Sequence, residues 1–227
     1  MKLKQIYPAL ILVFLSSVSI AQVNSFTIDS NKFNKSAMLM LDTIYKDDQG
    51  GRYRMQELSK NKATGPQIDS AIKAMREIDA KNLIKIRGII KKYGWLGPQD
   101  VGMNSSQGLF LVIQHADLAT QEEYLPMIRD AVKEGKTLSS NLALLEDRVA
   151  MREGKKQIYG SQVFRSKTTG KMYFYPIEDP DHVDERRKTV DLQPIAEYAK
   201  LFNLNWDIAE YKRSLPEIEK AAKEQKL

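Results

Sequence analysis

Three short blocks of polar residues interrupt apolar segments in the middle of this chain. They are Gln114-His115-Ala116-Asp117, Asp147-Arg148, and the run from Gln157 to Gln162. Polar groups in apolar surroundings raise the free energy of the folded state unless they are paired. Because the three blocks lie close together in the sequence, they predict one shared polar site.

His115 carries the main chemical possibility of the first block. An imidazole with an unperturbed pKa near 6.5 can act as a general acid or base, and Gly108, two turns earlier on the same helix, leaves room beside the ring for a ligand. The alternative is a core histidine that hydrogen-bonds a neighbouring carbonyl. Asp117 either orients His115 as a carboxylate partner or caps the turn into the following helix.

The second block lies on a helix expected over 137–152. Leucine and valine form one apolar stripe on this helix, and Leu144 and Met151 form a second on the opposite side. A helix covered on two faces is central, so we expect Asp147 and Arg148 to be at least half buried. Adjacent residues diverge by about 100° around a helix, so each needs another partner. A structural ion-pair network and a functional site both fit this pattern.

The third block is expected on the first strand of a β-hairpin, with Gln157, Tyr159 and Ser161 on one face and Gln162 on the other. Amides and a phenol suit recognition of sugars, peptides or nucleosides by neutral hydrogen bonds, and they also suit plain hairpin packing. Together the blocks give two sets of candidates. The catalytic candidates are His115, Asp117 and Asp147, and the ligand-binding candidates are Gln114, Arg148, Gln157, Tyr159 and Gln162.

The composition of the chain limits the classes of partner that we expect it to bind. The chain has two histidines and no cysteine, so we expect neither a metal site nor a cofactor. No glycine-rich phosphate loop, nucleophile elbow or His-Glu-x-x-His motif occurs. The net charge is +6, but basic residues are scattered among acids, which argues against nucleic acid as a partner. The expected partner is a small molecule, a glycan or a peptide, and the oligomeric state is left open.

The N-terminus has the three parts of a secretory signal peptide. Lys2 and Lys4 are followed by an uncharged, mostly apolar run over 7–20, and Ser19 and Ala21 are small residues at the positions that a signal peptidase inspects. We expect cleavage after Ala21 and a secreted or periplasmic protein. The alternative is an uncleaved N-terminal anchor. No later segment is apolar enough to insert stably into a membrane.

Periodicity and turn residues predict a mainly α fold, a helical single domain with a small β-hairpin insertion. The first helix, over 35–48, is expected to end at Asp47-Asp48-Gln49-Gly50-Gly51, where turn formers gather. A polar connection, 52–65, and a charged loop, 176–191, are also expected. The other expected helices cover 64–93, 104–116, 120–132, 137–152, 193–202 and 207–225, with hairpin strands at 157–164 and 172–175.

We divide the chain into four parts on this basis. They are a signal peptide over 1–21, a lead-in with the first helix over 22–64, a helical core with the hairpin near 157–175 over 65–205, and a helical tail over 206–227.

The ordered blocks resemble those of a bacterial family catalogued as a domain of unknown function. That family is similar in its Gly-Trp-Pro-like loop, matched here by Gly94-Trp95-Leu96-Gly97-Pro98, with two residues between Trp95 and Pro98. Its next blocks match the three polar blocks above, and a late acidic and basic block matches 176–187. The resemblance covers roughly 83–198 and is fairly specific as a series. It implies no activity.

Two functions follow as hypotheses. The first is an exported protein with a polar-ligand pocket, and for an enzyme the favoured reaction is hydrolysis. His115 is then the general acid or base, Asp117 or Asp147 orients it, and Arg148 stabilises developing negative charge. The second is a non-catalytic envelope interaction protein whose polar blocks form a buried structural network.

Overall fold

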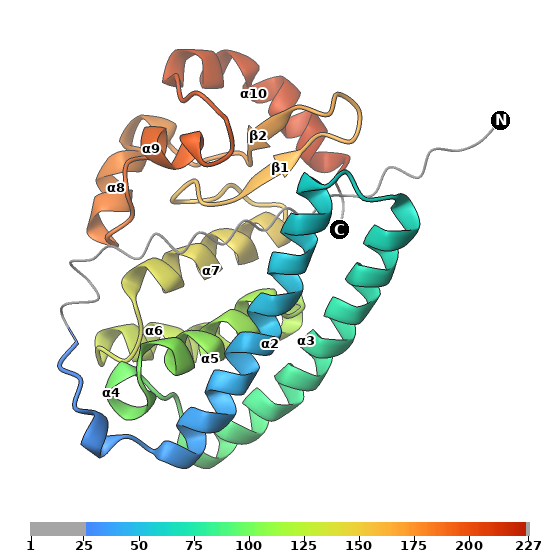
Figure 1. The fold of residues 1–227 in the computed structure, drawn as a ribbon. Helices are drawn as coiled ribbons and strands as arrows, with labels where there is room; N and C mark the ends of the chain where they lie inside the picture. Colours follow the sequence, from blue (N-terminus) through green and yellow to red (C-terminus); the bar gives the residue numbers. More distant parts are fainter. Residues whose placement is uncertain (1–25, 226–227) are drawn as a thin grey trace. The chain divides into compact units, whose positions relative to one another are not determined.

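The computed structural model describes residues 26–225, and in this range the chain forms nine α-helices, two short 3-10 helices and one two-stranded sheet (Figure 1). The mainly α prediction with a small hairpin is therefore confirmed. Contacts divide the described chain into two compact units, an N-terminal unit up to Leu142 and a C-terminal unit from Ala143. The predicted signal peptide lies outside the described residues, and the predicted boundaries at 64 and 205 stay predictions.

The N-terminal unit is built from helices alone. A 3-10 turn, η1 (Ser30–Lys32), leads into the long helices α2 (Lys35–Lys60) and α3 (Gly65–Tyr93), which form an antiparallel hairpin (Figure 1). The unit continues through α4 (Pro98–Val101), α5 (Met103–His115) and α6 (Leu118–Lys133). The start of α7 (Ser139–Arg152) also belongs to it, and the rest of α7 belongs to the C-terminal unit.

The prediction that the first helix ends at Gly50-Gly51 is wrong, because α2 continues to Lys60. A side-chain Cβ at Gly51 would lie 3.0 Å from Met75 Cγ, so this glycine allows a close approach to α3 and does not break the helix. Directly after Gly51, Arg52 forms a bidentate ion pair with Asp79 of α3. Tertiary contacts thus outweigh the local turn preference of the Asp-Asp-Gln-Gly-Gly run.

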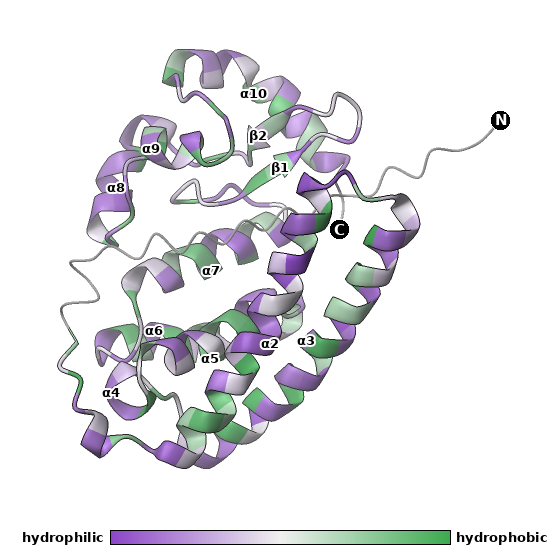
Figure 2. Cartoon of the chain, viewed as in Figure 1, coloured by the Kyte–Doolittle hydropathy of each residue, from purple (hydrophilic) through white to green (hydrophobic). Residues whose placement is uncertain are grey.

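Helix α3 begins as its sequence predicts. The Thr64 amide donates to Gln67 Oε1 at 2.9 Å, which is half of a capping box, and the helix then runs unbroken through Gly88. In Figure 2, α2 and α3 alternate between hydrophilic and hydrophobic residues along their length. Their apolar faces contribute to the core of this unit, where Leu41, Ile44, Ile86, Leu109, Ile113 and Ile128 are fully buried.

Helix α5 packs closely on α2 and runs in the same direction. Ser105 Oγ donates to Asp42 Oδ1 near the start of α5, and His115 meets Asp48 at its end. Between these points, a Cβ at Gly108 would lie 3.0 Å from both Leu41 O and Tyr45 Cβ. The space beside Gly108, which the sequence suggested for a ligand, is therefore filled by α2.

Besides the rest of α7, the C-terminal unit has three helices and a hairpin, with a core of both aromatic and aliphatic side chains. Strand β1 (Val163–Arg165) pairs antiparallel with β2 (Met172–Phe174), with Phe164 opposite Tyr173. The helices are α8 (Val183–Thr189), which follows the 3-10 turn η2 (Pro180–His182), α9 (Ile195–Lys200) and α10 (Ile208–Lys223). The prediction of a loop over 176–191 is thus wrong in its second half. Buried Val183 and Arg187 give α8 an inward face.

Residues 157–162 are not part of a strand, so the predicted alternation of their side chains is wrong. Apart from a single parallel bridge between Gln157 and Ile177, this segment is irregular. Gln157, Ser161 and Gln162 are all buried, although they were expected on opposite faces. Side chains of the same unit form hydrogen bonds with backbone groups of this segment in place of a sheet ladder. Among the described residues, no helix is both long and apolar enough to cross a membrane.

Candidate functional site

His115 forms a buried pair with Asp48, a residue that the sequence did not suggest. His115 is the last residue of α5, and its Nδ1 lies 2.9 Å from Asp48 Oδ1 on α2. The two side chains are 2% and 1% exposed. The closeness of α2 and α5 at Gly108, two helical turns earlier, allows this contact.

The Asp48 carboxylate is held from several sides. Gln49 Nε2 donates to Oδ2 at 2.8 Å, and Arg52 Nη1 lies 3.4 Å from Oδ1. Burial on its own would raise the pKa of Asp48, but the His115 ring, the Arg52 charge and the Gln49 amide outweigh it and hold this pKa below its usual value. Asp48 is thus an ionised carboxylate at neutral pH.

Arg52 links this pair to the third long helix. Its Nη1 and Nη2 donate to the two carboxylate oxygens of Asp79 at 2.6 and 2.9 Å, and Nη1 also donates to the Asp48 backbone carbonyl. A guanidinium bound to a carboxylate by two parallel hydrogen bonds is fixed in orientation as well as in position. The series of side-chain contacts from Asp79 through Arg52 and Asp48 to His115 therefore connects α3, α2 and α5.

This arrangement determines the form of the imidazole. An ionised carboxylate can only accept, so the short contact with Asp48 requires the proton of neutral His115 on Nδ1. The lone pair is then on Nε2. A carboxylate that holds one ring nitrogen fixes the tautomer and stabilises the imidazolium that forms when the other takes up a proton. The pair therefore has the composition of a general acid–base couple.

The other residues of the first block have local partners. Asp117 Oδ1 accepts the Thr120 amide at 2.8 Å, so Asp117 caps α6, which is one of the two roles predicted for it. Gln114 is fully buried, and its backbone carbonyl accepts Gln121 Nε2. Asp48 thus holds His115, while Asp117 starts the next helix.

Asp147 is the centre of the second and third blocks. As expected, it and Arg148 are buried, at 0% and 3% exposure. The Asp147 carboxylate accepts the backbone amides of Ile158, Tyr159 and Ser161 at 2.6 to 2.9 Å. Burial raises the pKa of Asp147, and the three amides offset part of this effect.

Other side chains hold further backbone groups of the same segment, which we call the 157–162 loop, while the backbone N–H and C=O of Gln157 pair with Pro176 and Glu178. Gln157 spans it, since its Oε1 accepts the Gln162 amide and its Nε2 donates to the Gln162 carbonyl. Three more carbonyls each accept from one side chain of the same unit, namely Ile158 from Arg186, Tyr159 from Arg187 and Ser161 from the Tyr198 hydroxyl. The loop is thus bound at both its donors and its acceptors.

The charges around Asp147 include two buried arginines. The Arg187 guanidinium stacks 4.9 Å from the centre of the Tyr198 ring. Burial raises the pKa of Tyr198 to about 12, although the charges of Arg187 and Arg148 act in the opposite direction. Arg148 therefore belongs to the charged surroundings of Asp147 and Tyr198 in the C-terminal unit, whereas His115 belongs to the N-terminal unit.

Gly160 fixes the shape of the 157–162 loop. Its φ of 66° lies in the left-handed region that favours glycine. A Cβ there would lie 2.8 Å from Ile195 Cδ1 and 3.0 Å from Ile177 Cδ1. The glycine seen in the sequence thus serves close packing of the loop on the core of the unit.

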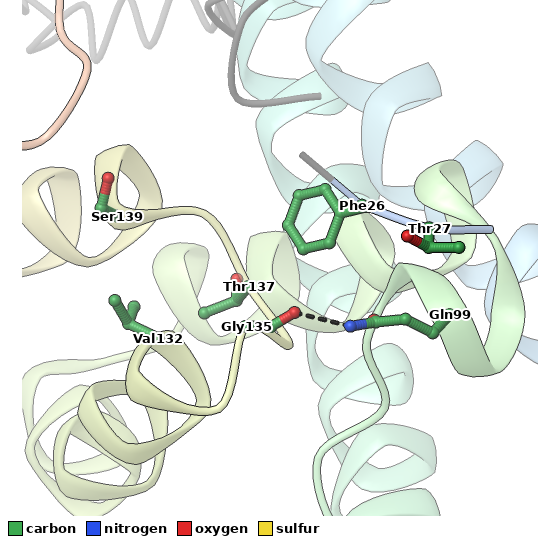
Figure 3. Close-up of a pocket in the computed structure, with 7 residues that line it drawn as sticks. All are labelled: Phe26, Thr27, Gln99, Val132, Gly135, Thr137 and Ser139. Atoms are coloured by element: carbon green, nitrogen blue, oxygen red, sulfur yellow. Dashed lines mark hydrogen bonds between the residues drawn. The ribbon is translucent and has the colours of Figure 1, made fainter. Parts of the chain in front are cut away.

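The N-terminal unit also contains a pocket of about 380 Å³, which none of the predicted site residues lines (Figure 3). Two of its lining residues are joined by a hydrogen bond, in which Gln99 Nε2 donates to the Gly135 carbonyl at 2.7 Å. This pocket lies at the end of α6, and His115 lies just before its start, so a helix of 16 residues, about 24 Å long, separates them. The lining residues are Phe26, Thr27, Gln99, Val132, Gly135, Thr137 and Ser139.

Within the described residues, no three histidine, aspartate or glutamate side chains gather as a set of metal ligands.

The model of a family of unknown function, DUF6624, matches residues 40–209, a range that includes the His115–Asp48 pair and the 157–162 loop. No curated protein and no solved structure gives a significant match.

Proposed function

The chain belongs to the DUF6624 family, and we propose that it is an exported protein whose His115–Asp48 pair acts as a general acid–base couple in hydrolysis of a polar ligand. The observation that carries the proposal is the 2.9 Å contact between His115 Nδ1 and Asp48 Oδ1, with Gln49 and Arg52 fixing the carboxylate. Asp48 takes the orienting role that the sequence suggested for Asp117 or Asp147.

The proposed chemistry follows from the tautomer of neutral His115, which carries its proton on Nδ1. His115 Nε2 accepts a proton from a water molecule as it attacks the ligand, and the same nitrogen returns the proton to the leaving group. Asp48 stays ionised throughout and stabilises the transient imidazolium, because its pKa is held low. Arg52 keeps Asp48 in place through its bonds to Asp79.

Under this proposal, the polar blocks of the C-terminal unit form a scaffold. Asp147 and Gln157 accept backbone amides of the 157–162 loop, and Gln162 Nε2 donates to Ser161 Oγ. The loop is thereby held in a fixed shape, and Tyr159 on it remains a ligand-binding candidate of the C-terminal unit. Arg148 remains a ligand-binding candidate of the C-terminal unit, and Gln114 remains one of the N-terminal unit.

A second function is favoured by a specific observation, the burial of both partners. Side chains that are 2% and 1% exposed are also what a structural ion pair shows. In that case the protein is a non-catalytic envelope interaction protein, and the His115–Asp48 pair and the Asp147 cluster both stabilise the fold.

A thermal-shift screen separates the two functions. The mature protein, His115→Gln and Asp48→Asn are screened against envelope sugars, peptides and nucleotides. A ligand at 100 times its Kd stabilises a protein by about 2.7 kcal/mol. The matched control is His182→Gln, because His182 is the other histidine of the chain and its side chain is 58% exposed.

The proposal expects a ligand that raises the Tm of wild type and His182→Gln but not that of His115→Gln. If His115→Gln and Asp48→Asn are only less stable, and no ligand shifts any of the four proteins, the structural function is supported instead.

A further inference from the structure

Asn82 is a buried amide with an unused donor. It lies in the middle of α3, is 1% exposed, and its Nδ2 has no hydrogen-bond partner among the described residues. Folded proteins pair the great majority of such groups, because a buried N–H without an acceptor costs about as much as a lost hydrogen bond. A donor in this position calls for an oxygen that the described part of the chain does not supply.

The register of α2 and α3 places Asn82 beside the His115–Asp48 pair. The two helices are antiparallel (Figure 1), and Arg52 of α2 is bound to Asp79 of α3. One turn onward from Asp79 along α3 is Asn82, and one turn back from Arg52 along α2 is Asp48. Asn82 therefore lies level with Asp48, on the buried side of α3, at the junction where α5 ends at His115.

A second donor at this junction is also unused. Both terminal nitrogens of Arg52 have acceptors, but its buried Nε has none among the described residues. The Arg52 guanidinium lies between Asp48 and Asp79, so its Nε belongs to the same layer of the α2–α3 pair. Two unused N–H groups in one layer favour an oxygen acceptor over any donor.

The charges at the junction restrict this oxygen to a neutral one. Asp48 and Asp79 bring two negative charges, Arg52 brings one positive charge, and His115 adds a second only when protonated. An anion would thus meet at least as much negative as positive charge. We propose that the α2–α3–α5 junction binds a neutral oxygen acceptor, held by Asn82 Nδ2 and Arg52 Nε next to the His115–Asp48 pair.

The use of this oxygen in acid–base chemistry rests on the proposed function. The presence of the oxygen at the junction does not. A neutral oxygen has two sources, an ordered water molecule or a carbonyl or hydroxyl oxygen of the ligand. In both cases it is held beside the couple that would move its proton or polarise it. Occupancy of the junction is measurable without any turnover, so the site and the catalytic proposal can fail separately.

The test compares two apolar substitutions of buried amides. Asn141→Leu removes an amide whose Nδ2 donates to Gln107 and Thr137, so it loses stability in any case and serves as the matched control. If Asn82 holds an oxygen, Asn82→Leu also lowers the Tm, by about 2–6 °C for a chain of this size. If the amide is a true orphan, the leucine leaves the Tm unchanged or raises it.

Magnetic resonance of the ¹⁵N-labelled wild-type protein then identifies the occupant. A water molecule gives cross-peaks between the Asn82 side-chain amide protons and the water signal. If the site is meant for a ligand oxygen, the purified protein shows no such cross-peaks. Addition of acetamide, a neutral carbonyl probe, then shifts the Asn82 amide resonance, and addition of acetate does not. The site is supported when Asn82→Leu is less stable and one of these two signals is seen. An unchanged or raised Tm, a response to acetate alone, or the lack of both signals overturns it.

Discussion

Asp147 shows how one carboxylate can organise a segment of chain. Three backbone amides of the 157–162 loop point at its two oxygens. These donors would otherwise be buried without partners, because the loop forms no sheet ladder. The carboxylate therefore replaces the hydrogen bonds that a strand would have made.

We expect Asp147→Asn to lower the free energy of unfolding by about 2–4 kcal/mol. The asparagine amide places an N–H against backbone donors, and it lacks the negative charge that strengthens the hydrogen bonds. Urea unfolding measures the loss. Glu153→Gln, an exposed acid just after the end of α7, is the control and should change stability by less than about 0.5 kcal/mol. Equal losses in the two variants would contradict the role given to Asp147.

The low pKa of Asp48 leads to a pH prediction. A carboxyl whose pKa is lower in the folded state than its unfolded value near 3.9 stabilises the fold above that value. This contribution is lost as the pH falls through the folded pKa. Asp147 acts with the opposite sign, because burial raises its pKa.

We therefore expect wild type to exceed Asp48→Asn in unfolding free energy most clearly above about pH 4, with the difference shrinking toward pH 2. Urea unfolding of both proteins between pH 2 and pH 6 measures it. The comparison cancels Asp147 and the other groups that do not contact Asp48, whereas His115 and Arg52 interact with the Asp48 charge and are part of the measured difference. A difference that stays constant over this range would show that the Asp48 charge adds nothing to the fold.

At the scale of elements, the close approach of α5 to α2 positions the His115–Asp48 pair. Gly108 is the point of contact, since any side chain there would meet Leu41 O and Tyr45 Cβ at 3.0 Å. The backbone oxygen on α2 cannot move without moving the helix. The distance between the helices, and with it the reach of His115, therefore depends on this residue.

Gly108→Ala should cost about 1–3 kcal/mol of stability, because a methyl group is forced into a filled space. Gly88→Ala is the matched control, a glycine within α3 whose added Cβ would meet nothing within 4 Å. There alanine should gain up to about 1 kcal/mol through its better helix propensity. Chemical unfolding of the two variants checks both signs, and the same sign in both would argue against the close-contact account.

The long amphipathic helices could be predicted from the sequence, and so could the burial of Asp147 and Arg148, because both follow from spacing along one helix. Asp48 could not, because the Asp47 to Gly51 run has the composition of a turn, and only contacts with α3 and α5 keep it helical. The i, i+4 spacing of Asp48 and Arg52 was the local signal. The 157–162 loop was read as a strand because its side-chain partners, Arg186 and Arg187, are distant in sequence.

At the scale of the whole molecule, the two compact units hold different polar clusters. The N-terminal unit contains the His115–Asp48 pair with Arg52 and Asp79, and the C-terminal unit contains Asp147 with the 157–162 loop. Acid–base chemistry is proposed for the first cluster, and support of the loop for the second. The family match covers most of both units.

The proposed export concerns the whole chain and gives a prediction of its own. We expect a protein expressed from the full sequence in a bacterial host to be recovered outside the cytoplasm with Gln22 as its first residue. Intact mass and cell fractionation measure this. Ala21→Arg places a large charged residue at the cleavage position and should leave the chain unprocessed. A wild-type chain that keeps Met1 or stays in the cytoplasm would contradict export by a cleaved signal.

Acid–base catalysis by the His115–Asp48 pair is tested by the turnover of four purified proteins, namely wild type, His115→Gln, Asp48→Asn and His182→Gln. They are assayed against chromogenic esters, amides, glycosides and phosphodiesters after circular dichroism has shown that each is folded. We expect one substrate class that wild type and His182→Gln hydrolyse alike and that His115→Gln hydrolyses at least about 100-fold more slowly. Asp48→Asn should also be impaired. No turnover in any of the four, or equal turnover in all of them, would contradict it.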